Sequence, residues 1–402
     1  MSASEEVVAK ARALLQSSQA DKALELLAPQ YETNGENVIF LQIFGETLLE
    51  NNQLEDAYNV LVKACELDPQ AEQVSGTEKF FYFGQIVGGQ DGINALDIGL
   101  QRLQYQLQLL EGEQGEQDAA LVELAKLYTT KQQLRTYLIK KLNQGIFAKI
   151  EIWMTDLCME EEAEQQCNDL IDFSLSLDPQ NPEALSLLAS IRISQQRNDE
   201  AKESLLKSWE LFKEKKTKLE DAANELQNGA SEDEEKDSFE VGLEYVELIQ
   251  PLSTLARFAI ELELYDTAIT IASNTQDIND SILESYYYEA LANLFNAKKI
   301  YFAETGNKNQ EEDYRDIETK VLSKSKNTQI QSLLAEARSS LTQGFKVINS
   351  EAVEDADPGL VEQVQELLTE LGGPVMSELM PPRRNDGEEE GWEDEIESED
   401  ED

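Results

Sequence analysis

Hydrophobic residues recur every three or four positions through most of the chain, and short polar turns interrupt them. The clearest segment is 38–71, in which Leu41, Phe44 and Leu48 mark one apolar face. A polar turn follows at 51–53, and Leu61 continues the apolar spacing beyond it. This pattern predicts two antiparallel helices joined by a tight turn. Runs of alternating β-branched residues, which would indicate strands, do not occur.

Small residues repeat within this pattern at a period of thirty-four. Gly45 and Ala57 stand where two antiparallel helices must approach closely, and a shift of one period replaces them with Ala11 and Ala23. The same offsets recur at Thr155 and Cys167, at Ala189 and Ala201, at Ala256 and Ala268, and at Ala290. The period resembles the tetratricopeptide repeat (TPR), although no repeat has the tryptophan of that motif.

The repeats predict an all-α, superhelical TPR solenoid with a concave groove lined mainly by the first helix of each hairpin. Another solenoid of helical hairpins is the alternative. We expect the solenoid to occupy residues 1–372, with irregular segments near 112–146, 214–238 and 306–327. A last amphipathic helix that begins at Asp357-Pro358 and runs through Leu371 would form a C-terminal cap.

Residues 373–402 are expected to form a disordered acidic tail. Residues 385–402 contain twelve acidic side chains and no lysine or arginine. Across the chain, 81 acidic residues outnumber 33 basic ones, for a net charge of −48. Such a protein repels nucleic acid and anionic membrane surfaces, so we expect a basic protein partner. The alternative interpretation is that the acidity only maintains solubility.

Chemistry-bearing residues are scarce. Histidine is absent, which excludes Ser-His-Asp and Cys-His catalysis and removes the commonest zinc ligand. The glycine-rich run Gly88–Gly92 is interpreted as a turn between helices, since no phosphate-binding motif is present. The three cysteines are interpreted as core residues of a protein from a reducing compartment. We therefore expect no enzyme activity, no catalytic residue, no cofactor and no metal.

Candidate partner-binding residues are those on first helices that face away from the paired second helix. They combine carboxylates, which bind lysine and arginine, with aromatic rings, which stack on guanidinium groups. The alternative for each carboxylate is a solvated surface, and for each aromatic ring an interhelical core. The candidates are Glu46, Glu50, Glu78, Phe81, Asp156, Glu160, Glu261, Glu284 and Tyr287.

The layout of the whole chain is similar to that of the fungal dedicated assembly chaperones of large-subunit ribosomal protein four. The residues that carry this resemblance are the repeats with Ala11, Gly45 and Ala57, the break at 177–179, the segment 372–374 and the acidic run 388–394. The resemblance implies a chaperone that holds the basic internal loop of its newly made ribosomal protein in an acidic concave groove. It further implies escort from the cytoplasm to pre-ribosomes in the nucleus, with a nuclear import factor as an additional partner.

Two other functions remain open. An acidic TPR histone chaperone would share the acidic tail and the basic client, and a scaffold or adaptor subunit would have stable stoichiometric partners. A TPR adaptor for heat-shock chaperones is disfavoured, because it would need basic residues at first-helix positions that are mostly acidic or apolar here.

Overall fold

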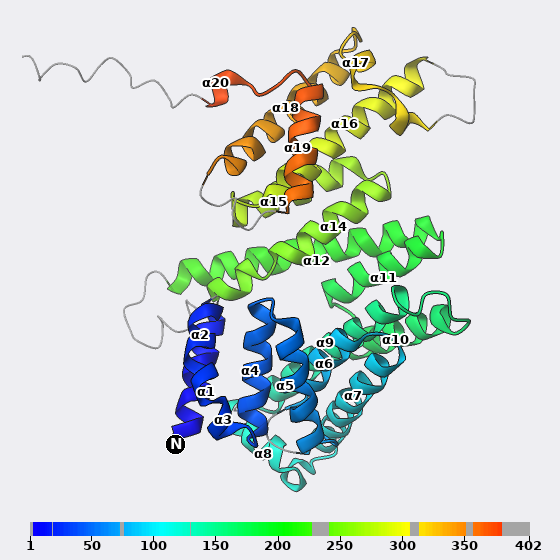
Figure 1. Ribbon diagram of the computed structural model, residues 1–402. Helices are drawn as coiled ribbons and strands as arrows, with labels where there is room; N and C mark the ends of the chain where they lie inside the picture. Colours follow the sequence, from blue (N-terminus) through cyan, green and yellow to red (C-terminus); the bar gives the residue numbers. More distant parts are fainter. Residues whose placement is uncertain are drawn as a thin grey trace, which may run out of the picture. The chain divides into compact units, whose positions relative to one another are not determined.

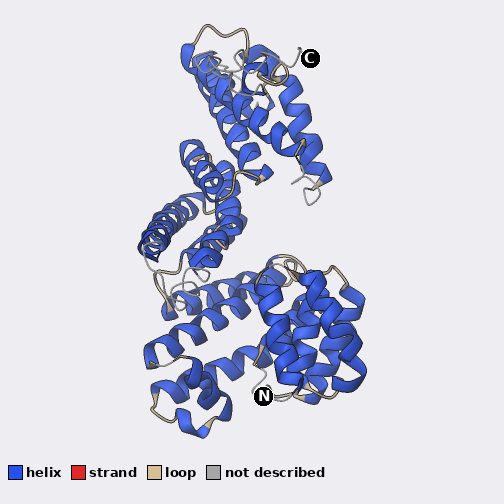
Figure 2. Cartoon of the chain, turned by 90° about the vertical axis from the view of Figure 1, so that its left-hand side faces the viewer, coloured by secondary structure: helices blue, strands red, loops and turns tan. Residues whose placement is uncertain are grey.

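The computed structural model describes residues 3–17, 19–72, 76–128, 130–226, 241–305, 313–350 and 357–379. Within these ranges all regular structure is helical and no strand occurs (Figure 2). The all-α class predicted from the sequence is confirmed. Among the same residues, no helix combines the length and the apolar character needed to cross a membrane.

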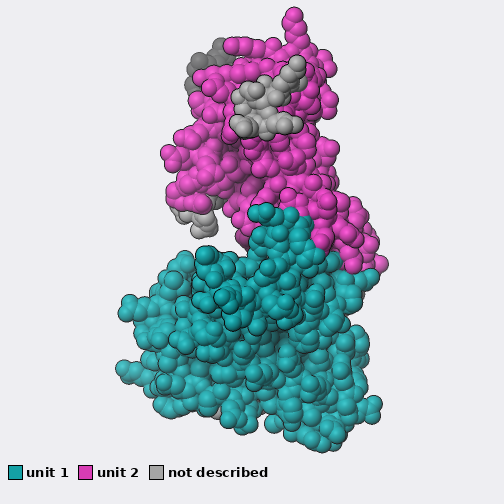
Figure 3. Space-filling model, turned by 90° about the vertical axis from the view of Figure 1, so that its right-hand side faces the viewer, with its two compact units in different colours: residues 1–197 teal, residues 198–402 magenta. Residues whose placement is uncertain are grey.

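The chain divides into two compact units, residues 1–197 and residues 198–402 (Figure 3). We call them unit 1 and unit 2 and describe each separately.

Unit 1 begins with three helical hairpins, each packed on the next (Figure 1). The first pairs α1 with α2, and a short 3-10 turn and helix α3 follow it. The helices are α1 (Ala3–Gln16), α2 (Ala20–Leu27), η1 (Ala28–Gln30), α3 (Tyr31–Asn34), α4 (Val38–Glu50), α5 (Leu54–Leu67), α6 (Glu78–Val87) and α7 (Gly89–Glu111).

The remainder of unit 1 departs from the regular hairpins. A 3-10 turn and a short helix lead into one long helix, which packs on both α7 and α10. These elements are η2 (Gly115–Gln117), α8 (Ala119–Leu127), α9 (Lys131–Met154), α10 (Ala163–Leu177) and α11 (Pro182–Ser194).

The small residues of the thirty-four-residue period are buried as expected. Ala11, Ala23, Ala57 and Ala64 have no exposed surface. At Gly45, an added Cβ would lie 2.6 Å from Leu61 Cδ2, so α4 and α5 pack too closely for a larger residue there. The packing of these hairpins confirms the TPR character of the repeats.

The repeat that contains Thr155 differs from the prediction. Thr155 was expected inside a first helix, but α9 ends at Met154 and Thr155 caps it, with its backbone N–H and its hydroxyl both donating to the carbonyl of Glu151. Residues 155–162 form a turn of eight residues before α10. The 34-residue spacing is kept there with a longer turn and a shifted first helix.

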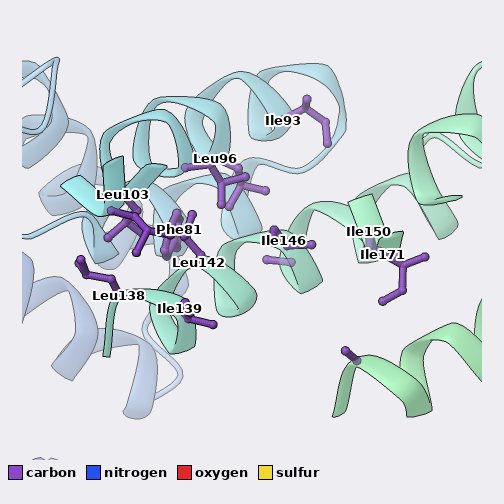
Figure 4. Close-up of a cluster of buried hydrophobic side chains, with 14 of the residues drawn as sticks. Phe81, Ile93, Leu96, Leu103, Leu138, Ile139, Leu142, Ile146, Ile150 and Ile171 are labelled. Atoms are coloured by element: carbon purple, nitrogen blue, oxygen red, sulfur yellow. The ribbon is translucent and has the colours of Figure 1, made fainter. Parts of the chain in front are cut away.

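The largest apolar cluster of unit 1 lies between α6, α7, α9 and α10 (Figure 4). Phe81 of α6 packs at its centre with Leu142 of α9, and Leu96 and Leu103 come from α7. Gly99 and Gly145 lie against the ring of Phe81, where an added Cβ would approach ring atoms to 2.6 and 2.7 Å. Close packing around one aromatic ring therefore fixes the spacing of these three helices.

Unit 2 contains a series of antiparallel helices in which α14 packs on α15, α15 on α16, and α16 on α18. A short helical stretch at 241–246 precedes α14. The other elements are α12 (Asn198–Leu226), α14 (Ile249–Glu261), α15 (Tyr265–Ile278), α16 (Leu283–Thr305), η3 (Tyr314–Asp316), α17 (Thr319–Leu322), α18 (Thr328–Ile348), α19 (Pro358–Glu370) and α20 (Met376–Leu379).

The expected C-terminal capping helix is present as α19. The Asp357 carboxylate accepts the N–H of Gly359 at its start, and Gly372 and Gly373 adopt positive φ after its end. Val364 and Leu368 bury one face of α19 against α16 and α18. The predicted acidic tail lies outside the described residues from 380 onward, as do positions 227–238 and 306–312 of the segments predicted to be irregular.

Candidate functional site

Side chains from α1, α4, α6 and α9, with Ala20 of α2, line a concave surface in unit 1. It encloses a cavity of about 610 Å³. The residues that line this cavity are Arg12, Leu15, Gln16, Ala20, Gln42, Ile43, Glu46, Glu50, Glu78, Tyr82, Tyr137 and Lys141.

Helix α4 supplies the polar wall of the cavity. Gln42, Glu46 and Glu50 are spaced by four residues, so they lie on one face of the helix. The opposite face, which includes Leu41 and Leu48, is buried in the apolar core. The amphipathic pattern of α4 thus directs both acidic side chains and the amide into the cavity.

Glu78 stands at the start of α6 and faces Lys141 of α9 across the cavity. Their Oε1 and Nζ atoms are 3.0 Å apart, and Gln42 Nε2 donates to the other carboxylate oxygen at 3.4 Å. Burial is the largest single influence and would raise the pKa of Glu78, but the charge of Lys141, the hydrogen bonds from the Glu78 backbone and from Lys141, and the charge of Arg12 together lower it. Glu78 is therefore ionised at neutral pH and partly neutralised by Lys141.

Glu46 has a different environment, because its hydrogen-bond partner is neutral. The Tyr82 hydroxyl donates to its carboxylate. Burial, reinforced by the nearby charge of Glu78, raises the pKa of Glu46 despite this hydrogen bond. The ionised carboxylate of Glu46 is consequently stabilised poorly by its protein surroundings.

A second cavity of about 580 Å³ continues the first along α1, α6, α8 and α9. Both are lined by Gln42, Glu78, Tyr137 and Lys141. We call the surface that lines the two cavities the unit 1 groove. Its charges are mixed: the first cavity has three carboxylates and two cations, and the second adds Glu123 and Lys126, which pair with each other.

One candidate on α6 does not reach the groove. Phe81 is only 6% exposed and lies in the apolar cluster between α6, α7 and α9, so it cannot stack on a partner there. Its neighbour Tyr82 lines the groove instead. The physical reason is that α7 and α9 enclose α6 from the side that Phe81 occupies.

Asp156 and Glu160 also lie away from the predicted position on a first helix. Both are exposed in the turn between α9 and α10. The Asp156 carboxylate accepts the N–H of Gly89 at 2.8 Å and thereby caps the start of α7. The run Gly88–Gly92 was predicted to be an interhelical turn, but only Gly88, at a φ of 63°, lies between the helices, and residues 89–92 form the first turn of α7.

The remaining candidates belong to unit 2. Glu261 is exposed at the end of α14, and its backbone carbonyl accepts from Arg315. Glu284 lies half-buried in the first turn of α16. Tyr287 packs against the apolar cluster under α19, with its ring 5.9 Å from that of Tyr288. The structure therefore brings together Glu46, Glu50 and Glu78 within one cavity.

Three further residues of the groove, Arg12, Tyr137 and Lys141, were not among the candidates predicted from the sequence. Tyr137 and Lys141 belong to the first half of α9, within the segment 112–146 that was predicted to be irregular, so no repeat offset identifies them. Their spacing of four on an amphipathic helix was the available signal. Among the described residues, no group of carboxylate and thiol side chains has the arrangement of a metal site.

Unit 1 is thus a TPR-type domain whose groove combines carboxylates, an amide and tyrosines with the cations Arg12 and Lys141, and this class of fold presents a surface to an extended peptide. Comparisons with known proteins agree with this class. Residues 281–396 match the family described as the ACL4 C-terminal domain. The chain is also similar to a Schizosaccharomyces pombe protein named probable assembly chaperone of rpl4, with 28% identity over 272 residues that cover 67% of each chain.

An Emericella nidulans protein with the same name is 29% identical over 215 residues, which span 51% of this chain and 48% of that protein. The fold is similar to a solved structure of the assembly chaperone of RpL4 (Acl4, residues 1–338). That match has a TM-score of 0.55 and 23% identity, and it covers 75% of this chain and 99% of the other. The resemblance to this family inferred from the sequence is confirmed. The chaperone names and the TPR fold both favour a non-enzymatic protein.

Proposed function

We propose that this protein is an assembly chaperone for a large-subunit ribosomal protein of the L4 type, and that the unit 1 groove binds a basic extended segment of this client. It takes up the client in the cytoplasm and accompanies it to pre-ribosomes in the nucleus. A nuclear import factor is the additional partner for entry into the nucleus. The similarity to proteins named assembly chaperone of rpl4 supports the choice of client.

The observation that carries this proposal is the meeting of Glu46, Glu50 and Glu78 from two first helices in one cavity. Carboxylates held this way form charge-assisted hydrogen bonds with lysine and arginine. A ribosomal loop outside the ribosome lacks the RNA that neutralises it. The groove substitutes for that RNA, and phosphates compete for the same cations when the client is delivered.

Charge reversal tests the proposal. The variant Glu46→Lys with Glu50→Lys should bind a purified L4-type ribosomal protein at least about tenfold more weakly, a loss of about 1.4 kcal/mol. Isothermal titration calorimetry at low salt measures the change, and circular dichroism verifies that each variant is folded.

The matched control is Glu160→Lys with Glu161→Lys, which changes the net charge equally in the turn between α9 and α10. The control should bind nearly as the natural chain does. Equal weakening in both double variants would mean that binding depends on total charge and not on the groove. Tighter binding of core histones than of the ribosomal protein would favour a histone chaperone instead.

A further inference from the structure

Lys141 of α9 is a cation that lies inside the unit 1 groove. Its side chain lines both cavities and is only 22% exposed. Its Nζ atom lies 3.0 Å from Oε1 of Glu78, whose own side chain is 18% exposed. Because water reaches this ion pair only in part, the attraction between its two charges is stronger than that of a pair on an open surface.

These contacts of Lys141 are the ones that a cation of a bound segment would make. One is the charge-assisted contact with the carboxylate of Glu78. The other is with an aromatic ring, since Nζ of Lys141 lies 5.8 Å from the ring centroid of Tyr137. The ring of Tyr137 in turn stacks on that of Tyr128, with 4.6 Å between the centroids. A lysine of the chain itself thus occupies the contacts that an incoming lysine or arginine would use.

The carboxylates on α4 are not neutralised in this way. Among the described residues, neither Glu46 nor Glu50 forms an ion pair, and the hydrogen-bond partner of Glu46 is a neutral tyrosine. Arg12 of α1 also faces Glu46 and Glu78, but its side chain is exposed, so solvent and salt screen its charge. Glu78 is therefore the groove carboxylate for which an internal cation competes most directly.

We infer that Lys141 is an internal competitor for the basic side chains of the client and lowers the affinity of the groove for them. This inference rests on the proposed function and concerns the regulation of the same site. A client side chain reaches Glu78 only by displacing Lys141, which then remains in the groove as a like charge beside it. The competition limits how tightly the client is held and thereby favours its later release to RNA.

The first test is Lys141→Met in the full-length chain, which removes the charge and keeps an unbranched side chain. Glu78 then lacks its cation, so the free energy of unfolding should fall. The client supplies the missing cation, so the purified L4-type ribosomal protein should bind about tenfold more tightly, a difference of about 1.4 kcal/mol. A residue that only supported the fold would lose stability and binding together. Urea denaturation measures the first quantity and isothermal titration calorimetry the second.

The second test asks whether Lys141 acts through Glu78. Glu78→Gln removes the carboxylate for which the two cations compete, so adding Lys141→Met to it should tighten binding by less than about twofold. Lys141→Arg keeps the cation and should bind as the natural chain does. Lys140→Met is the matched control, because Lys140 is exposed on α9 and does not line either cavity. It should change the affinity by less than about twofold.

Three results would overturn the competition. Lys141→Met could be folded and bind no more tightly, its gain could persist in full with Glu78→Gln, or Lys140→Met could gain as much. Lys141→Gln, which can still donate to Glu78, serves as the second variant should methionine disturb folding, and it too should bind more tightly. If the charge reversal on α4 still weakens binding in each case, the proposed function stands without the competition. Failure of the natural chain to bind the ribosomal protein would overturn both.

Discussion

At the scale of single residues, Glu46 shows how binding and stability oppose each other. Burial raises its pKa, so its pKa in the folded state lies above that in the unfolded chain. Such a carboxyl contributes stability while it is protonated, and this contribution is lost as the pH rises through the folded pKa. At neutral pH the ionised carboxylate is therefore kept at the expense of stability, and a bound cation would recover that loss.

This argument predicts the behaviour of Glu46→Gln. The amide can still accept from Tyr82, so the variant should have a higher free energy of unfolding than the natural chain at pH 7. The difference should shrink as the pH is lowered toward the pKa of Glu46, and binding of the basic client should weaken by about tenfold. Chemical denaturation across this pH range measures the first effect and calorimetry the second.

Glu50→Gln is the control for Glu46→Gln, since Glu50 is exposed on the same face of α4. It should weaken binding and leave the free energy of unfolding at pH 7 nearly unchanged, because substitutions of exposed side chains change stability little. A loss of stability in Glu46→Gln at neutral pH would contradict our account of its environment.

At the scale of elements, the crossing of α6 and α7 depends on two glycines. Gly84 of α6 faces Gly92 of α7, and a Cβ at Gly84 would lie 2.9 Å from the carbonyl oxygen of Gly92 and 2.9 Å from Leu96 Cγ. Backbone atoms cannot move aside as a side chain can. The two helices must therefore separate to admit even one methyl group.

We predict that Gly84→Ala lowers the free energy of unfolding by about 1–3 kcal/mol, although alanine is the better helix former. Urea denaturation followed by circular dichroism gives the value. Gly242→Ala is the matched control, because it lies in a helical stretch with no described atom within 4 Å of the added Cβ. It should cause no loss, and equal losses in both variants would refute the role of the crossing.

Much of this element structure could be predicted, because the small residues of the period mark positions where helices touch. Ala11, Gly45 and Ala57 lie in the regular part of the repeat pattern. Their spacing therefore predicts the first two hairpins directly. The side of a helix that meets solvent is harder to predict. Phe81 and Tyr82 are adjacent on α6, and only the position of α9, which no repeat offset marks, determines that Tyr82 faces the groove.

The turn after α9 illustrates a second limit. Thr155 preserves the offset of the repeat, yet its side chain ends a helix by donating to the Glu151 carbonyl. Short polar residues stabilise helix ends and also occur in helix interiors. The residue type at 155 alone therefore could not distinguish a helix end from a helix interior. Asp156 and Glu160 were placed on a helix face for that reason.

At the scale of the whole molecule, the net charge of −48 acts over longer distances than any single contact. Twelve of the acidic residues lie in 385–402. Long-range attraction raises the rate at which a basic protein is encountered more than it slows its release, and salt screens it. The groove residues, by contrast, act only after contact.

We predict that replacing these twelve acids with their amide counterparts slows association with the basic client by about threefold or more at low salt and leaves the dissociation rate nearly unchanged. Stopped-flow fluorescence at low and high salt separates the two rates. The effect should disappear at high salt, where charges are screened. An unchanged association rate at low salt would limit long-range attraction to the folded part of the chain.

Helix α9 links the groove to the interior of unit 1 mechanically. Its 24 residues form one uninterrupted rod of about 36 Å. Tyr137 and Lys141 line the groove near one end, and Ile146 and Ile150 are buried toward the other. The rod cannot tilt to widen the groove without opening the interior, so a polypeptide that bound in the groove would meet a template of set width. The conformational entropy lost on binding would then be mainly that of the incoming polypeptide, which must adopt a shape that fits the groove.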